Sequence, residues 1–179
     1  DNKSFFNATN GGMGLTGVIL SVSFKIIKIE NNIINEKIYK TQSLDETIEL
    51  IERNNKKKYV VAWIDTTTDD KNIGRGIIFT GEHSLKKNHK IRKLNFKIKI
   101  LFDFPSFFLN NFLIKLLNIV YYFLHPNYKS REVHYEKFFY PLDNILDWNK
   151  IYGKKGFCQF QLIIPKKNIN HNLKKILIL

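Results

Sequence analysis

The chain has 179 residues, enough for one ordinary domain with a sizeable core, and its 44% hydrophobic and 14% aromatic content excludes a disordered protein. A single cysteine, Cys158, excludes an internal disulfide and a cysteine-cluster metal site. The net charge of +13 suits an anionic partner such as nucleic acid, phosphate or a membrane surface. However, a genome rich in A and T would impose the same abundance of Lys, Asn and Ile on any protein, so we predict no nucleic-acid binding.

The first feature along the chain is a glycine run, NGGMGLTGVI, at residues 10–19. Such a run indicates a tight turn as readily as a backbone that approaches a phosphate. It precedes a strand pattern instead of following one, which argues against a Rossmann site. Residues 18–29 alternate between apolar and polar as far as Ile26, and this pattern predicts a strand. Residues 31–41 predict a turn and a second short strand.

The clearest helix is predicted to begin after Ser43. Ser43 and Glu46 have the spacing of a capping box, and an apolar face follows at Leu44, Ile48 and Ile51. Beyond this helix, residues 59–65 and 76–83 predict two strands of the buried type, separated by a polar loop.

The next segments are more apolar. Residues 94–104 alternate strictly until Pro105 breaks the pattern. Residues 107–124 are about long enough to span a bilayer, but the sequence is interrupted by Asn and Lys residues, at Asn110, Asn111, Lys115 and Asn118. An amphipathic or buried helix is therefore the better prediction for this segment than a membrane span.

The C-terminal part has few regular signals between residues 125 and 156. Residues 157–165 predict a strand closed by proline, on which Gln159 and Gln161 share one side. These amides either face solvent or line a polar pocket that holds hydroxyl groups. Residues 166–179 predict the start of a helix. Strands with interspersed helices indicate an α+β fold.

Compact catalytic motifs are absent from the sequence. Neither a P-loop nor a GxSxG motif occurs. The five histidines are not spaced as metal ligands would be; they are His83, His89, His125, His134 and His171. We therefore predict no metal site. Trp63, inside the strand at 59–65, is either a core residue or the wall of a pocket.

Several segments together resemble one known family. FFNATNGGMGLTGVI, then AWID followed by GRG and GEH, then FFYPLDNILDWNKIYGKKGFCQFQLIIP occur in this order. They resemble the decaprenylphosphoryl-β-D-ribose 2′-oxidase family, FAD enzymes of the vanillyl-alcohol-oxidase type, whose relatives include aldonolactone and alditol oxidases. The resemblance runs from Phe5 to the end of the chain. The last segment is its specific part, because glycine runs are common to wider relatives.

The resemblance implies two partial domains. Residues 1–30 would end a vanillyl-alcohol-oxidase-type FAD-binding domain, and residues 31–179, with the apolar segment 107–124, would form part of a substrate domain built on a mixed or antiparallel sheet. The chain starts without Met and stops inside an apolar pattern, so we expect an internal fragment. The catalytic residues are unknown here, because the family's lysine would lie beyond Leu179.

The resemblance also implies site residues. Those expected to contact FAD are Gly11, Gly12, Gly14 and the backbone of Val18; those expected to line the substrate pocket are Trp63, Phe139, Gln159 and Gln161. Three positions depart from the mycobacterial enzymes. Val61 stands where they have serine, Phe139 where they have tyrosine, and Tyr140 where they have histidine. The loss of side-chain hydroxyls changes which hydroxyl groups of a sugar the pocket can bind. The resemblance therefore leaves the precise substrate undetermined.

The expected function is that of an FAD-dependent oxidoreductase acting on CH–OH groups. Its substrate would be a polyprenylphosphoryl pentose, oxidised at C2 to a keto sugar as the first half of an epimerisation. A separate NAD(P)H-dependent reductase would then complete the reaction. The alternatives are an FAD oxidase of a soluble aldonolactone or alditol, or a non-catalytic basic domain that binds nucleic acid or membrane. The apolar segment predicts peripheral membrane contact. A cytoplasmic or peripheral-membrane location is favoured, with the periplasm as the alternative.

Overall fold

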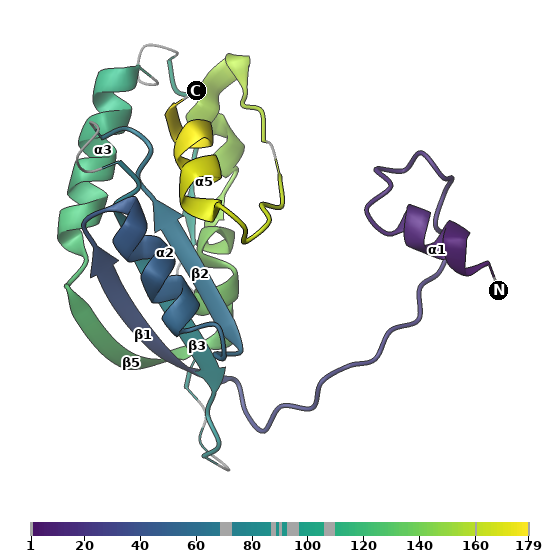
Figure 1. Cartoon of the computed structure of the whole chain (residues 1–179). Coiled ribbons are helices and arrows are strands. Elements are labelled where there is room, and N and C mark those ends of the chain that lie inside the picture. The colour runs from purple at the N-terminus through teal and green to yellow at the C-terminus, as the bar shows by residue number, and fades with distance from the viewer. Residues whose placement is uncertain are drawn as a thin grey trace.

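The computed structural model describes residues 2–68, 73–86, 89, 91–92, 97–105, 110–159 and 161–178 (Figure 1). It contains a four-stranded antiparallel sheet in the order β2-β3-β1-β5, together with helices and a short parallel pair, β4 and β6. This arrangement confirms the α+β class. The elements are α1 (Lys3–Thr9), β1 (Ile33–Thr41), α2 (Leu44–Arg53), β2 (Tyr59–Ile64), β3 (Gly76–His83), β4 (Ile98–Lys99), α3 (Asn111–Leu124), β5 (Tyr128–His134), α4 (Tyr135–Phe139), β6 (Ile145–Leu146) and α5 (Ile169–Ile178), with 3₁₀ turns η2 (Pro141–Asn144) and η3 (Trp148–Lys155).

Strand β1 occupies an interior position in the sheet because it is apolar on both of its faces. Ile33, Ile34 and Ile38 have exposed fractions of 0%, 0% and 2%. The strand pairs with β3 along one edge and with β5 along the other. The strand predicted within residues 31–41 is therefore confirmed.

Helix α2 covers one face of the sheet, as Figure 1 shows, and begins as the capping box predicts. The Ser43 hydroxyl accepts the backbone N–H of Glu46 at 3.3 Å, while the Glu46 carboxylate accepts the N–H of Gln42 at 2.6 Å. Leu44 and Ile48 are buried beneath the helix. Helix α5 lies beside α2, where the Asn170 side chain donates to Asp45 at 2.8 Å.

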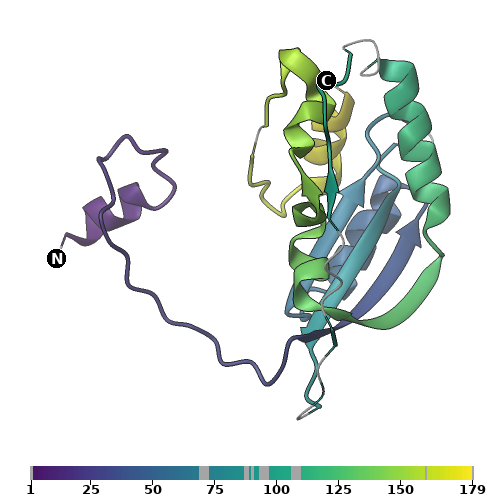
Figure 2. The ribbon, with the colours of Figure 1, turned by 180° about the vertical axis from the view of Figure 1, so that it is seen from behind.

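The opposite face of the sheet is covered by α3 and α4, which Figure 2 shows from behind. Tyr122 of α3 packs with Ile38 and Ile77, and Phe138 of α4 packs with Ile34 and Val133. Phe79 of β3 contacts both groups and joins them into one continuous layer. Two helices thus divide this face between them.

The strand predicted at residues 18–29 does not form. Residues 17–29 are extended but pair with no strand in the described chain, and they run away from the sheet in Figure 1. Val18, Leu20 and Phe24 have exposed fractions of 88%, 93% and 78%. An alternating pattern marks side chains that could face a core, but a strand also needs a neighbouring edge to satisfy its backbone groups.

The structure differs from the predicted strands in two further places, at residues 94–104 and at β5. Of the pattern at residues 94–104, positions 94–96 lie outside the described residues, and only Ile98–Lys99 pairs, in parallel with Ile145–Leu146. Strand β5 was missed because an edge strand has one free side, and its sequence, YKSREVH, is mostly polar. The helices predicted within 107–124 and 166–179 are confirmed as α3 and α5.

A buried ion pair closes the turn between β2 and β3. Asp65 is fully buried, and its Oδ2 accepts from Arg75 Nε at 3.1 Å and Nη2 at 2.9 Å. Its Oδ1 accepts from the Thr67 N–H at 3.0 Å, the Thr67 hydroxyl at 2.8 Å and the Asn118 amide at 3.1 Å. Burial on its own would raise the pKa of Asp65, but the hydrogen bonds from Thr67 and the Arg75 charge outweigh it and lower the pKa.

We expect Asp65→Ala to lower the free energy of unfolding at pH 7 by about 3–5 kcal/mol, because Arg75 would lose its partner in a buried site. Urea denaturation measures this difference. The matched control is Glu49→Ala, whose partner Arg53 is exposed. It should cost about 0.3–0.5 kcal/mol. Equal losses in the two variants would contradict a special role for the buried pair.

The same pair should respond to acid. Since the folded state lowers the pKa of Asp65, its stabilising effect is complete above the unfolded value near 3.8 and fades as pH falls through the folded value. The stability difference between wild type and Asp65→Ala should therefore stay constant from pH 7 to pH 5 and shrink below pH 4 in an acid titration of unfolding.

Candidate functional site

The pleat of β2 places Tyr59, Val61 and Trp63 on the face of the sheet that α3 and α4 cover. Val61 pairs with Phe79 and Trp63 with Ile77 across to β3. Successive residues of a strand point to opposite faces, so these side chains share one surface. Val61, between the two aromatic residues of its strand, remains 53% exposed.

Helix α3 adds aromatic rings to this surface. The Tyr121 ring lies 4.9 Å from Trp63 and 4.6 Å from His125, and His125 meets Phe79 edge-on at 5.8 Å. His125 Nδ1 also lies 2.9 Å from the Tyr121 carbonyl oxygen. We call Trp63, Phe79, Tyr121 and His125 the aromatic patch. Its rings pack on one another, and Trp63 and Phe79 also pack on the buried cluster of Ile38, Ile77 and Tyr122, so the patch is half-buried.

The Tyr121 phenol stays protonated at neutral pH. Burial, together with the charge of Glu36, raises its pKa above the usual value near 10. It can therefore donate a hydrogen bond to a ligand as well as accept one.

Phe139 lies at the other end of the same face. Its ring packs edge-on against Tyr59 at 4.8 Å, within the core layer around Phe138. Trp63 and Phe139 therefore lie on the same face of the sheet, with exposed Val61 between them, and their role in a pocket stays a prediction. The neighbouring Tyr140 is 52% exposed.

Gln159 and Gln161 are not brought to this surface by a strand. Residues 156–159 and 161–165 form no strand, so the strand predicted at 157–165 is wrong, and both glutamines are exposed. Phe157 packs on Tyr152 at 4.4 Å and on Trp148 at 5.4 Å. Aromatic packing of Phe157, in place of strand pairing, holds the start of this segment. The role of the two amides in a pocket stays a prediction.

The glycine run forms an open turn after α1. Gly11, Gly14 and Gly17 have positive φ angles of 86°, 78° and 131°, and no atom lies within 4 Å of where a side chain would begin. A Cβ at Gly12 would collide with the Ala8 carbonyl, so glycine is required there for the turn itself. Val18, just beyond, is 88% exposed. This turn alone encloses nothing, and contact of its backbone with a cofactor stays a prediction.

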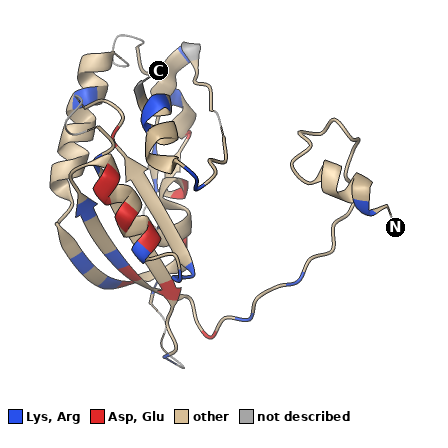
Figure 3. Ribbon diagram, viewed as in Figure 1, with Lys and Arg blue, Asp and Glu red and all other residues tan. Residues whose placement is uncertain are grey.

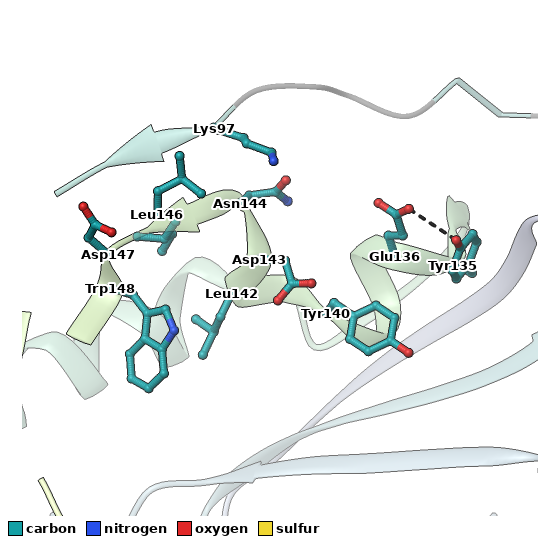
Figure 4. Close-up of a pocket in the computed structure, with 11 residues that line it drawn as sticks. Lys97, Tyr135, Glu136, Tyr140, Leu142, Asp143, Asn144, Leu146, Asp147 and Trp148 are labelled. Carbon is teal, nitrogen blue, oxygen red and sulfur yellow. Dashed lines mark hydrogen bonds between the residues drawn. The ribbon is translucent and has the colours of Figure 1, made fainter. Parts of the chain in front are cut away.

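A hollow of about 510 Å³ lies beside η2 and β6 (Figure 4). It is lined by acidic and aromatic side chains, among them Glu136, Asp143, Asp147, Tyr140 and Trp148. Asp147 is held by Lys150 at 3.3 Å and by Lys99 at 4.0 Å. Within the described chain, no group of three or more His, Cys, Asp or Glu residues could hold a metal ion.

Sequence reasoning missed the residues that support the aromatic patch. Asn118 donates to Asp65 at 3.1 Å and to Thr67 at 3.1 Å, and thereby ties α3 to the end of β2. Arg75 lies 4.3 Å from the Tyr122 ring centre, which adds a cation–π contact. An acid at the end of one predicted strand and a base at the start of the next could have revealed the ion pair. The partners on α3 carry no such signal.

The fold and this surface define an α+β chain whose antiparallel sheet carries an aromatic face. No family model matches the chain. It is similar to a decaprenylphosphoryl-β-D-ribose oxidase of Mycolicibacterium smegmatis. The two are 29% identical over an alignment 180 residues long, which covers 94% of this chain. The match confirms the resemblance predicted from the motifs. The chain spans 39% of the length of that relative.

The exposure of Val61 can be tested through stability. Val61→Ala should lower the free energy of unfolding by less than about 1 kcal/mol, because the side chain is half in water. Ile77→Ala, a truncation of a fully buried neighbour, should cost about 2–5 kcal/mol. Urea denaturation of both variants measures the contrast. A large loss for Val61→Ala would mean that the surface is covered in solution and is no open site.

Proposed function

We propose that this chain is part of an FAD-dependent oxidoreductase that oxidises a secondary alcohol of a sugar. The similarity to a decaprenylphosphoryl-β-D-ribose oxidase, over nearly the whole of this chain, is the observation that carries the proposal. The substrate is then a polyprenylphosphoryl pentose, oxidised at C2 to a keto sugar. An NAD(P)H-dependent reductase completes the epimerisation as a separate partner.

The proposal divides the chain at the point where it joins the sheet. Residues 1–30 end a vanillyl-alcohol-oxidase-type FAD-binding domain, and residues 31–179 belong to the substrate domain. The flavin, when bound, takes up the hydride that leaves the carbinol carbon. Gly11, Gly12 and Gly14 let the backbone pass close to it, and the backbone of Val18 contacts it. The open turn at these glycines supports this assignment.

The aromatic face supports a sugar ring as substrate. Trp63 offers an apolar wall to the face of the ring, and Phe139 closes the other end of the surface. Gln159 and Gln161 would supply amides that both donate to and accept from the hydroxyls at the ring edge. Valine at position 61 leaves the middle of this surface without a hydroxyl group. The sugar recognised here is therefore held by fewer polar contacts at that point.

Absorbance of the full-length protein tests the cofactor and the class of substrate. We expect a yellow protein with a flavin spectrum that bleaches under anaerobic conditions when polyprenylphosphoryl pentose is added, because the substrate then reduces the flavin. Bleaching by an aldonolactone or an alditol alone would support the soluble-sugar alternative. A colourless protein that FAD cannot reconstitute would leave the non-catalytic basic domain as the better explanation.

Substitutions in the full-length enzyme test the pocket. Trp63→Ala, Gln159→Ala and Gln161→Ala should each lower kcat/KM while FAD stays bound, by about fivefold or more for the loss of roughly 1 kcal/mol of contact. Gln42→Ala is the matched control, since Gln42 is the remaining glutamine of the chain and is exposed beside α2. Normal turnover by both variants at positions 159 and 161 would show that the amides do not line the pocket.

A further inference from the structure

Helix α3 is apolar around most of its circumference and turns two polar side chains, Asn118 and Tyr122, toward the protein. Asn118 bonds to Asp65 and Thr67, and the hydroxyl of buried Tyr122 donates to the Thr41 carbonyl at 3.0 Å. A surface helix normally turns its apolar stripe to the core and its polar residues to water. Here the hydrogen bonds of Asn118 and Tyr122, together with the packing of Tyr122 on Ile38 and Ile77, dock the helix.

The outward side of α3 is consequently apolar along its whole length. Its side chains recur at helical spacing and have exposed fractions between 44% and 77%; they are Phe112, Leu116, Leu117, Val120, Phe123 and Leu124. We call these six residues the outer face of α3. A contiguous apolar surface of this kind marks a site of contact with another apolar body.

The surroundings of the outer face are cationic. The sequence holds no Asp or Glu from Phe104 to Arg131, whereas Lys115 and Lys129 fall in that stretch; Arg131 is paired with buried Glu36 and adds no net charge. At the C-terminal end of the helix, Lys40 Nζ lies 5.6 Å from the Phe123 ring centre. Figure 3 shows α3 uncharged except for one basic band, whereas the neighbouring strands carry both basic and acidic bands.

We propose that the outer face of α3 lies in the surface of a bilayer that contains anionic lipids. Apolar side chains flanked by cations match acyl chains beneath negative headgroups. The helix has 14 residues, about 21 Å at 1.5 Å per residue, which is short of a bilayer span. No helix in the described part of the chain could cross a membrane, so α3 lies along the surface.

Charge argues against a second copy of the chain as the occupant of this face. Each copy carries +13, and pairing two outer faces would bring their cationic borders together. The outer face also offers no hydrogen-bonding side chain, which a polypeptide partner would use for register. A lipid surface needs no such group. The proposed lipid contact does not depend on the proposed oxidation, because none of the six residues of the outer face belongs to the candidate substrate or cofactor site.

Sedimentation of the full-length protein with lipid vesicles tests the proposal. We expect binding to phosphatidylglycerol–phosphatidylcholine vesicles, weaker binding at high salt, and little binding to pure phosphatidylcholine. Leu116→Asp/Phe123→Asp should weaken binding at least about tenfold without unfolding, because both side chains point outward. The control, Leu85→Asp, alters another exposed leucine after β3 and should bind as wild type does. Equal binding by both variants would overturn the proposal.

A labelling experiment distinguishes the other occupants. The chain has a single cysteine, Cys158, so Leu116→Cys in a Cys158→Ser background accepts one polarity-sensitive dye. The dye should attach readily and shift to the blue when anionic vesicles are added. A thiol that stays unreactive without lipid would mean that protein covers the outer face, and size-exclusion chromatography would then tell a second copy from the remainder of the same chain. The flavin spectrum of each variant shows separately whether the proposed oxidoreductase function stands.

Discussion

The buried pair of Asp65 and Arg75 organises the part of the molecule around the sheet. Removing two charges from water is costly, and the cost is offset only when every remaining lone pair and proton finds a partner. Thr67 and Asn118 complete the shell of Asp65, while Tyr122 stacks against Arg75. Because Asn118 and Tyr122 belong to α3, the pair connects the β2–β3 turn to a distant helix, whose Asn118 lies 53 residues beyond Asp65 in the chain.

The way in which α3 docks on the sheet determines both the aromatic patch and the outer face of the helix. With Asn118 and Tyr122 bonded to the sheet and its β2–β3 turn, α3 brings Tyr121 and His125 against Trp63 and Phe79 and so builds the aromatic patch. The same rotation about the helix axis turns the outer face away from the protein. A helix docked through an apolar stripe would have hidden those side chains and shown Asn118 to water. The candidate ligand surface and the candidate lipid surface therefore share one cause.

The structure shows where the residues lie that the resemblance to the mycobacterial oxidase assigns to a substrate pocket. Trp63 and Phe139, which the resemblance assigned to one pocket, do lie on one face of the sheet, with Val61 exposed between them. Gln159 and Gln161 are exposed on a segment without strand pairing, and the glycine turn is open. The sheet thus places two of the expected pocket residues on one face, whereas the pocket itself, its polar contacts and its cofactor cradle remain proposals.

Local signals in the sequence were enough for β1, for α2 with its capping box, and for the existence of α3 and α5, because periodicity and caps act within a few residues. They failed at residues 18–29 and 157–165, where an alternating pattern exists but the described residues of these segments pair with no strand of the sheet. They also missed β5, whose polar sequence reflects its place at the edge. The sequence by itself determined the α+β class, the resemblance and the aromatic residues. Only the tertiary structure decided which way α3 faces, because that depends on a buried charge pair whose partners are distant in sequence and close only in the folded chain.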